Sequence, residues 1–299
     1  MTTFIAILVD GSIYASWLFL VSAGLTVIYG VMRILNMAHG SFYAIGAYAG
    51  ASLVGWWFSG AGGNPYVSYL LLLGAALVAG LVVGFFIEFS LLRRMYGRDE
   101  ILMVIVTYAL LLILEDAIKL VWGVDPYFAY QPYGLLGRVS FSGLTFANYD
   151  LGLIGVSLVV GFGLWLILNR THKGKLLRAV IHDREVAVAM GVNVKAMFAV
   201  TFAVGTTLGA LAGALTAPAI SVSPGIGVEV IVLAFAVVVV GGMGSIGGAA
   251  AGAVLVGLTR AAAVHLAPEL ELFVIYGVMS LVLSVRPQGL FGQTLVRKI

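Results

Sequence analysis

Long apolar runs separated by short polar segments dominate the chain. They lie near residues 4–28, 39–58, 66–92, 101–122, 151–168, 196–219, 228–240, 246–265 and 270–285. A helix needs roughly 20 apolar residues to cross a bilayer, whereas the strands of a membrane barrel would alternate apolar and polar positions. Because these runs do not alternate, we expect an all-α polytopic transmembrane fold with about eight or nine spans. One domain would cover residues 1–299.

The run at residues 228–240 is short for a full crossing. The glycine-rich stretch Gly241-Gly242-Met243-Gly244-Ser245 follows it, and a comparable stretch joins Gly30 to Ser41. Each precedes a helix rich in small residues, which suggests an internal duplication. Transporter folds place broken helices around a central pathway, so we expect broken or re-entrant helices at these stretches.

The composition indicates that the chain lies in a membrane, and the distribution of charge predicts its orientation there. Only 10% of the residues are charged and the mean hydropathy is +1.10. A soluble domain of this size would need more charged residues to cover its surface. On this span count, 13 of the 16 Lys and Arg fall on one side of the membrane. The positive-inside rule makes that side cytoplasmic, with the N-terminus outside and the C-terminus inside. The same loops account for the pI near 9.1, so we expect no nucleic-acid partner.

A polar segment at residues 170–195 interrupts the apolar runs and carries six of the basic residues. Within it, Asp183 can cap a short helix, Glu185 suits its first turn, and Gly191 suits a left-handed end. The apolar residues of this helix would be exposed: Val186, Val188 and Met190. Such a helix predicts a groove on another protein. The alternative is the lipid surface, where anionic headgroups would repel the two acidic residues.

Ionisable residues inside the spans are few. Glu115 and Lys119 are four residues apart, which predicts an ion pair on one helix face. Arg260 lies deep in a span and requires an acidic partner. A membrane-embedded enzyme would need a polar cluster, for which Arg260, His265 and Glu269 are the candidates.

Absent motifs exclude several kinds of chemistry. The sequence has no phosphate-binding loop of the Gly-x-x-x-x-Gly-Lys-[Ser/Thr] type, no cysteine, and four scattered histidines. We therefore expect no ATPase site, disulfide or metal site in this chain, and no cofactor. The longest segment on the outer side, residues 123–150, combines prolines with four aromatic residues. It predicts either an ordered cap or a simple aromatic belt at the interface.

Several stretches are similar to one family. They are Gly24 to Gly40, Leu177 to Asn193, Ser223-Pro224-Gly225, Gly241 to Ser245 and Arg286 to Gly292. In this order they resemble Liv-type permeases, the membrane subunits of branched-chain amino acid ABC importers. Asn36-x-Ala38-His39-Gly40 resembles the H-type subunit rather than its M-type partner, although Met37 stands where phenylalanine is expected.

The resemblance implies a multi-subunit importer in a bacterial inner membrane. This chain would pair with a homologous second permease, two cytoplasmic ATPase subunits and a periplasmic solute-binding protein. ATP would be hydrolysed by the partner subunits. The residues that match the family's ATPase-coupling segment are Arg178, Asp183, Glu185, Ala187 and Gly191.

The solute is expected to pass between this subunit and its partner permease, along small and weakly polar side chains. The candidates are Asn36, His39, Ser41, Met243 and Ser245. The binding protein would dock near residues 123–150 and 221–227. The resemblance implies leucine-like amino acids as solutes, with urea, short amides and aromatic acids as alternatives. A channel or facilitator that needs no ATP is the alternative class of function.

Overall fold

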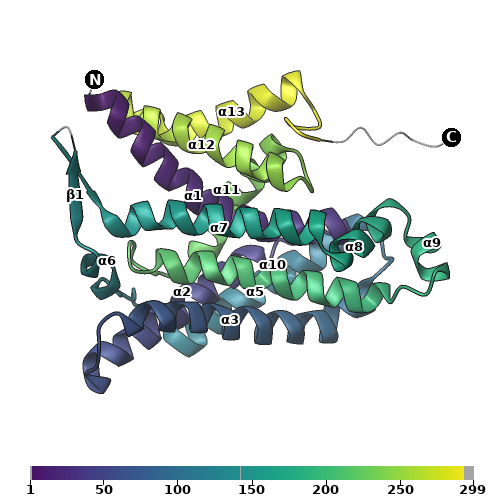
Figure 1. Cartoon of the computed structure of the whole chain (residues 1–299). Helices are drawn as coiled ribbons and strands as arrows, with labels where there is room; N and C mark the ends of the chain where they lie inside the picture. Colours follow the sequence, from purple (N-terminus) through teal and green to yellow (C-terminus); the bar gives the residue numbers. More distant parts are fainter. Residues whose placement is uncertain (1, 142, 293–299) are drawn as a thin grey trace.

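The chain folds as a bundle of long helices (Figure 1), in a computed structural model that describes residues 2–141 and 143–292. The long helices are α1 (Thr2–Met32), α2 (His39–Trp56), α3 (Val67–Ile87), α5 (Glu100–Trp122), α7 (Asn148–Arg170), α10 (Val194–Thr216), α11 (Ile226–Gly241), α12 (Ile246–Leu266) and α13 (Glu271–Val285). Each corresponds to one of the nine apolar runs. The predicted all-α polytopic fold is confirmed.

Short elements connect the long helices. They are α4 (Arg93–Met95), α6 (Gln131–Leu135), α8 (His172–His182), α9 (Arg184–Ala189), the π-helical turns Trp57–Ala61 and Glu88–Leu92, and the 3-10 turn Pro268–Leu270. The strands β1 (Arg138–Phe141) and β2 (Leu144–Ala147) form an antiparallel hairpin that pairs Arg138 with Ala147. This hairpin and α6 lie at one end of the bundle, and α8 and α9 lie at the other (Figure 1). We refer to these as the hairpin end and the α9 end.

Length and hydropathy mark six of the described helices as able to cross a membrane. They are α1, α3 with its extension to Met95, α5, α7, α10 and α12. Helix α11 has 16 residues, which span about 24 Å at 1.5 Å per residue. That is shorter than a hydrocarbon core of roughly 30 Å, as the sequence predicted for this run.

Glycines allow the central helices to approach closely. Gly205, Gly209 and Gly213 of α10 face Ile28 of α1 and His39 and Tyr43 of α2. Lipid supplies no hydrophobic drive between helices, so backbone proximity and dispersion contacts hold them together. This explains the repeated spacing of four residues between glycines in α10.

Helix α2 begins inside the bundle. Residues 33–38 are not helical, and the chain turns back after α1 so that His39 reaches the Val21 carbonyl at 3.0 Å. Gly40 of α2 contacts Gly227 in the first turn of α11. Two helices therefore start next to each other in the interior, which matches the broken-helix architecture expected before α2.

Candidate functional site

A cavity of about 1150 Å³ lies between α1, α7, α8 and α12. Its wall follows α1 from residue 12 to residue 31 and α7 from residue 154 to residue 169. The turn that joins α11 to α12 and the side chain of Phe291 complete the lining at the α9 end. The cavity therefore extends along most of the length of α1.

The walls of the cavity are mainly apolar and carry a few buried hydroxyl groups. Phe19, Phe162 and Trp165 supply aromatic surface. The lining also includes Thr26, which is only 1% exposed and whose hydroxyl has no hydrogen-bond partner in the described part of the chain. Ser157, in contrast, donates to the Ile154 carbonyl at 2.8 Å. A buried hydroxyl without a partner costs free energy, so Thr26 is a polar group of this wall whose hydrogen-bonding capacity is unused among the described residues.

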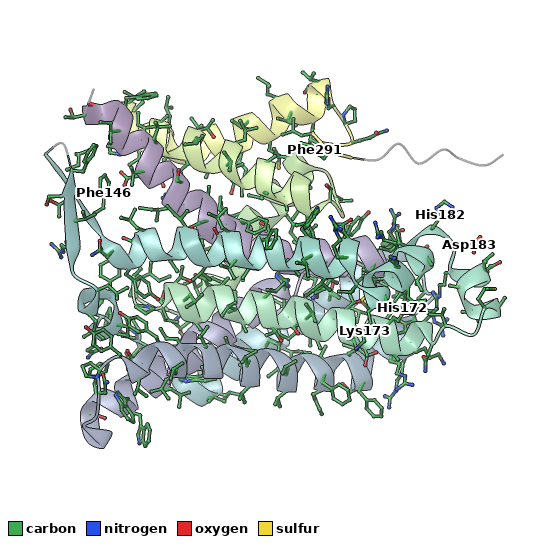
Figure 2. All side chains as sticks on the ribbon, in the orientation of Figure 1. Phe146, His172, Lys173, His182, Asp183 and Phe291 are labelled. Carbon is green, nitrogen blue, oxygen red and sulfur yellow. The ribbon has the colours of Figure 1, made fainter. Side chains whose placement is uncertain are left out.

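The α9 end of the cavity is cationic. Arg33 follows α1, Arg178 and His182 belong to α8, and all three line the cavity. Arg178 donates from Nη1 to the side-chain oxygen of Asn169 at 3.2 Å, which ties α8 to the end of α7. The residues that line the cavity include no aspartate or glutamate. Figure 2 shows His182 at this end of the bundle, far from Phe146 in the hairpin.

The glycine-rich turn after α11 is held on two sides. The amides of Leu290 and Phe291 each donate at 2.9 Å to the last carbonyls of α11, those of Val240 and Gly241. On the other side, Gly244 has φ +84° and packs against Gly30 of α1. The two stretches that the sequence marked as similar therefore touch each other. Figure 2 shows Phe291 beside this turn.

The cavity brings together two of the five predicted path residues. Met243 is 39% exposed and Ser245 caps α12 by accepting from the Gly248 amide at 3.0 Å; both line the cavity. Asn36, His39 and Ser41 are completely buried and do not line it. His39 packs between α1 and α10, and Ser41 donates to the Leu111 carbonyl at 3.4 Å. His39 and Ser41 therefore attach the start of α2 to α1 and α5, whereas the side chain of Asn36 has no hydrogen-bond partner among the described residues.

The polar segment at residues 170–195 contains the predicted short helix, α9, and a second helix, α8, that the sequence analysis did not predict. Asp183 accepts from the Val186 amide at 2.9 Å, and Gly191 follows the end of α9 with φ +82°. Glu185 lies in the first turn of α9 and Ala187 is its buried residue. The guanidinium of Arg184 lies 5.3 Å from the centre of the Phe198 ring, which attaches α9 to α10. In Figure 2, Asp183 marks the outer edge of this end.

Three apolar side chains of α9 and of the residue that follows it are exposed. Val186 is 57% exposed, Val188 56% and Met190 79%. They lie in a segment that is otherwise rich in charge, because Lys173, Lys175 and Arg178 precede it. Neighbouring apolar side chains that the protein does not cover indicate a surface for another molecule.

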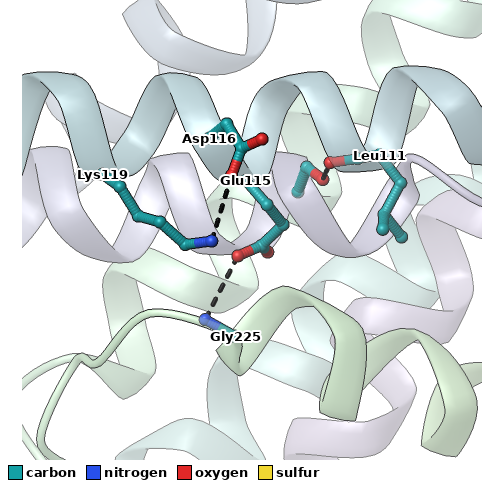
Figure 3. A network of polar contacts seen from close by, with 6 residues as sticks. Leu111, Glu115, Asp116, Lys119 and Gly225 are labelled. Carbon is teal, nitrogen blue, oxygen red and sulfur yellow. Dashed lines mark hydrogen bonds and ion pairs between the residues drawn. The ribbon is translucent and has the colours of Figure 1, made fainter. Parts of the chain in front are cut away.

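The predicted ion pair between Glu115 and Lys119 is wrong. Lys119 pairs with Asp116 at 3.0 Å, and Glu115 turns inward, where it accepts from the Gly225 amide at 3.1 Å (Figure 3). Glu115 is only 6% exposed. A carboxylate stabilises the positive N-terminal end of a helix, so Glu115 holds the start of α11 against α5. Sequence spacing could not distinguish this long-range contact from the local one.

Arg260 has the acidic partner that its position required. It pairs with Glu271 of α13 and lies 3.9 Å from the centre of the Tyr14 ring of α1. His265 pairs instead with Asp10 at 2.7 Å. Arg260 and His265 are thus in separate pairs, neither of which includes Glu269. The described residues contain no group of three metal-binding side chains.

The hairpin end forms an ordered cap. Tyr127 and Val222 exchange backbone hydrogen bonds at 2.8 and 2.9 Å, which attaches the segment after α5 to the segment before α11. Tyr133 donates to Asp150 at 2.6 Å. Burial and this carboxylate raise the pKa of the Tyr133 hydroxyl to about 12. Of the two predicted arrangements, the ordered cap is therefore the one observed.

Comparison with known proteins identifies similar chains over nearly the full length. The family described as the permease component of branched-chain amino acid transport systems matches residues 7–283. The high-affinity branched-chain amino acid transport system permease protein BraD of Pseudomonas aeruginosa is 30% identical, over 98% of this chain and 97% of the relative. LivH of Escherichia coli, with the same description, is 26% identical, over 97% of this chain and 94% of the relative.

A similar protein also occurs in an archaeon. The probable branched-chain amino acid transport permease protein LivH of Methanocaldococcus jannaschii is 29% identical, over 96% of this chain and 92% of the relative. No solved structure gives a significant match.

Proposed function

This chain belongs to the family of branched-chain amino acid transport permeases, and we propose that it is one of two membrane-spanning subunits of an ATP-driven importer. A homologous permease would be the second. Two ATPase subunits would supply the energy, because this sequence carries no phosphate-binding loop of its own. A solute-binding protein would deliver the amino acid on the opposite face.

The exposed apolar side chains of α9 and Met190 are the observation that supports this proposal most directly. This short helix has a capped start and a left-handed end. Val186 and Met190, four residues apart, are exposed on one side of it, and Val188 is exposed on the other. A groove on an ATPase subunit would bury these side chains, in the manner of a helix in a groove. Arg178, Asp183, Glu185, Ala187 and Gly191 would form the coupling segment, with Asp183 and Gly191 fixing its two ends.

The membrane orientation follows from the same assignment. The α9 end carries the basic residues of α4 and α8 and would face the cytoplasm of a bacterial cell, as the positive-inside rule requires. The C-terminus would lie on this side of the inner membrane. The hairpin end would face the periplasm and receive the binding protein, near residues 123–150 and 221–227.

The cavity beside α1 is our candidate for this subunit's half of the path. It extends along α1 and includes Met243 and Ser245. A second permease would close its open side, and the apolar walls suit a solute with an aliphatic side chain. Leucine-like amino acids would be carried, with urea, short amides or aromatic acids as the alternatives within the same class.

Replacing Gly191 by valine tests the coupling role. At φ +82° a residue with a Cβ atom is strained by about 1–2 kcal/mol, and the end of α9 would be rearranged. We expect the variant to insert normally and to lose ATP-dependent uptake of labelled leucine in cells that also contain its partner subunits.

Gly97 provides the matched control. It has φ +87° and lies in the loop before α5, and a Cβ atom added there would have no atom within 4 Å. Gly97→Val should therefore introduce the same strain without affecting uptake. Normal uptake by the Gly191→Val variant would contradict the coupling role, and uptake by the wild type without ATP would favour a channel or facilitator.

A further inference from the structure

We propose that the α9 end of the cavity is a binding subsite for the carboxylate of an apolar solute, formed by Arg33 and Arg178. This inference rests on the proposed function, because it assumes that the cavity belongs to the solute's path. It also narrows the class of solute. An apolar molecule with a carboxylate would be bound there, whereas urea, short neutral amides and cations would not.

The distribution of charge around the cavity is the first observation. Arg33, Arg178 and His182 line one end, and none of the described residues that line the cavity is acidic. The ion pairs in the described part of the chain involve other residues. Guanidinium groups bind carboxylates through charge-assisted hydrogen bonds in a fork geometry. A cation would have no acidic partner among these lining residues, so the α9 end of the cavity favours an anionic group.

The backbone of Arg33 is the second observation. With φ +56°, it is the one non-glycine residue in the described ranges that has a positive φ. It follows the last residue of α1, a position where glycine is usual because it adopts this conformation without strain. Strained residues persist where their side chain is needed. Here the strained residue is an arginine at the mouth of a cavity.

The walls next to these arginines provide space for an apolar body. Trp165 and Leu168 of α7 and Leu177 and Ile181 of α8 line the same end as Arg178. Farther along α1, the buried Thr26 hydroxyl has no hydrogen-bond partner in the described part of the chain. An anionic head next to an aliphatic or aromatic body matches leucine-like amino acids and aromatic acids.

The test uses the full-length protein in nanodiscs of phosphatidylcholine, without its ATPase partners. Three probes share one aliphatic body: 4-methylpentanoate, 4-methylpentanamide and 4-methylpentylamine. Binding is measured by saturation-transfer NMR at low ionic strength. We expect the carboxylate to bind best and the amine least. This preference should fall roughly five- to tenfold in Arg33→Gly and in Arg178→Gln, and it should decrease when salt screens the charges.

Two variants distinguish a loss of positive charge in the cavity from a loss of folding stability. Arg33→Gly places in the strained position the residue that suits it best, so its thermal stability should equal or exceed that of the wild type. Arg94→Gln removes an exposed arginine of α4 that does not line the cavity, and it should keep the full preference for the carboxylate.

Several results would overturn the assignment. Equal binding of the carboxylate and the amide by the wild type would do so, as would an unchanged preference in both arginine variants. A third would be loss of carboxylate binding in discs that contain phosphatidylglycerol, with recovery in Arg33→Gly. That result would identify a lipid headgroup as the occupant. None of these results depends on whether uptake requires ATP, so a failure of the subsite and a failure of the proposed function can be distinguished.

Discussion

Replacing Gly257 by alanine tests how closely α1 and α12 pack along the wall of the cavity. A Cβ atom at Gly257 would lie 2.6 Å from the Gly11 carbonyl oxygen and 2.8 Å from the Ala15 amide nitrogen. Ordinary contact begins at 3.4 Å, so α12 would have to move away from α1 by about 0.8 Å. Both obstructing atoms belong to the backbone of a helix and cannot rotate away.

The expected cost follows from this geometry. Overpacking a close contact destabilises a protein by about 1–3 kcal/mol. Alanine gains about 0.5–1 kcal/mol over glycine in a helix interior, so the net loss should be at most about 2.5 kcal/mol. In a chain of this size, one kcal/mol changes the melting temperature by about 2–4 °C. The melting temperature of the Gly257→Ala variant should therefore fall, by up to about 10 °C.

Thermal unfolding of the purified protein in detergent measures this change, and Gly155→Ala is the matched control. Gly155 lies in the interior of α7, is exposed, and has no atom within 4 Å of an added Cβ. Its variant gains helix propensity without a clash, so its melting temperature should rise slightly. If both variants shift the melting temperature in the same direction, the close packing of α1 on α12 has no influence on stability and our reasoning is refuted.

Two further substitutions address α9 and α11. Met190→Ser removes an apolar side chain that is 79% exposed; burial of methionine contributes about 1.5–3 kcal/mol, so affinity for the ATPase subunits should fall roughly tenfold in a binding assay. Val139→Ser in the hairpin is its control, and equal loss in both would contradict a docking role for α9. Glu115→Ala leaves the Gly225 amide without an acceptor and should lower stability by about 1–2 kcal/mol. Asp116→Ala, which breaks only an exposed pair, should change stability by at most about 1 kcal/mol, and equal effects would show that the Glu115 contact contributes nothing.

Most of the helices could be predicted from the sequence because lipid imposes a simple rule. Backbone groups in a membrane must be satisfied within the segment, so a long apolar run can only be a helix. The short helix α9 was also predictable, since Asp183 and Gly191 are local signals for its two ends. Both kinds of prediction depend on residues that are close together in the sequence.

The arrangement of the site could not be predicted in the same way. Residues 33–38 were correctly interpreted as a break, yet their polarity did not reveal that Asn36 and His39 would be enclosed between helices. Likewise, Glu115 was assigned a partner four residues away, whereas its contact lies 110 residues away at Gly225. Helix packing decides which side of a break faces a cavity, and packing depends on contacts between distant segments.

The cavity and α9 are connected by a single short helix. Leu177, Arg178 and Ile181 of α8 line the cavity, and Asp183 both ends α8 and caps α9. A rotation of α9 on an ATPase subunit would therefore act on the cavity wall directly, through one residue shared by two helices. The hydrogen bond from Arg178 to Asn169 would resist that motion by holding α8 to α7. Because Arg178 also belongs to the proposed carboxylate subsite, coupling and solute release would act on the same side chain.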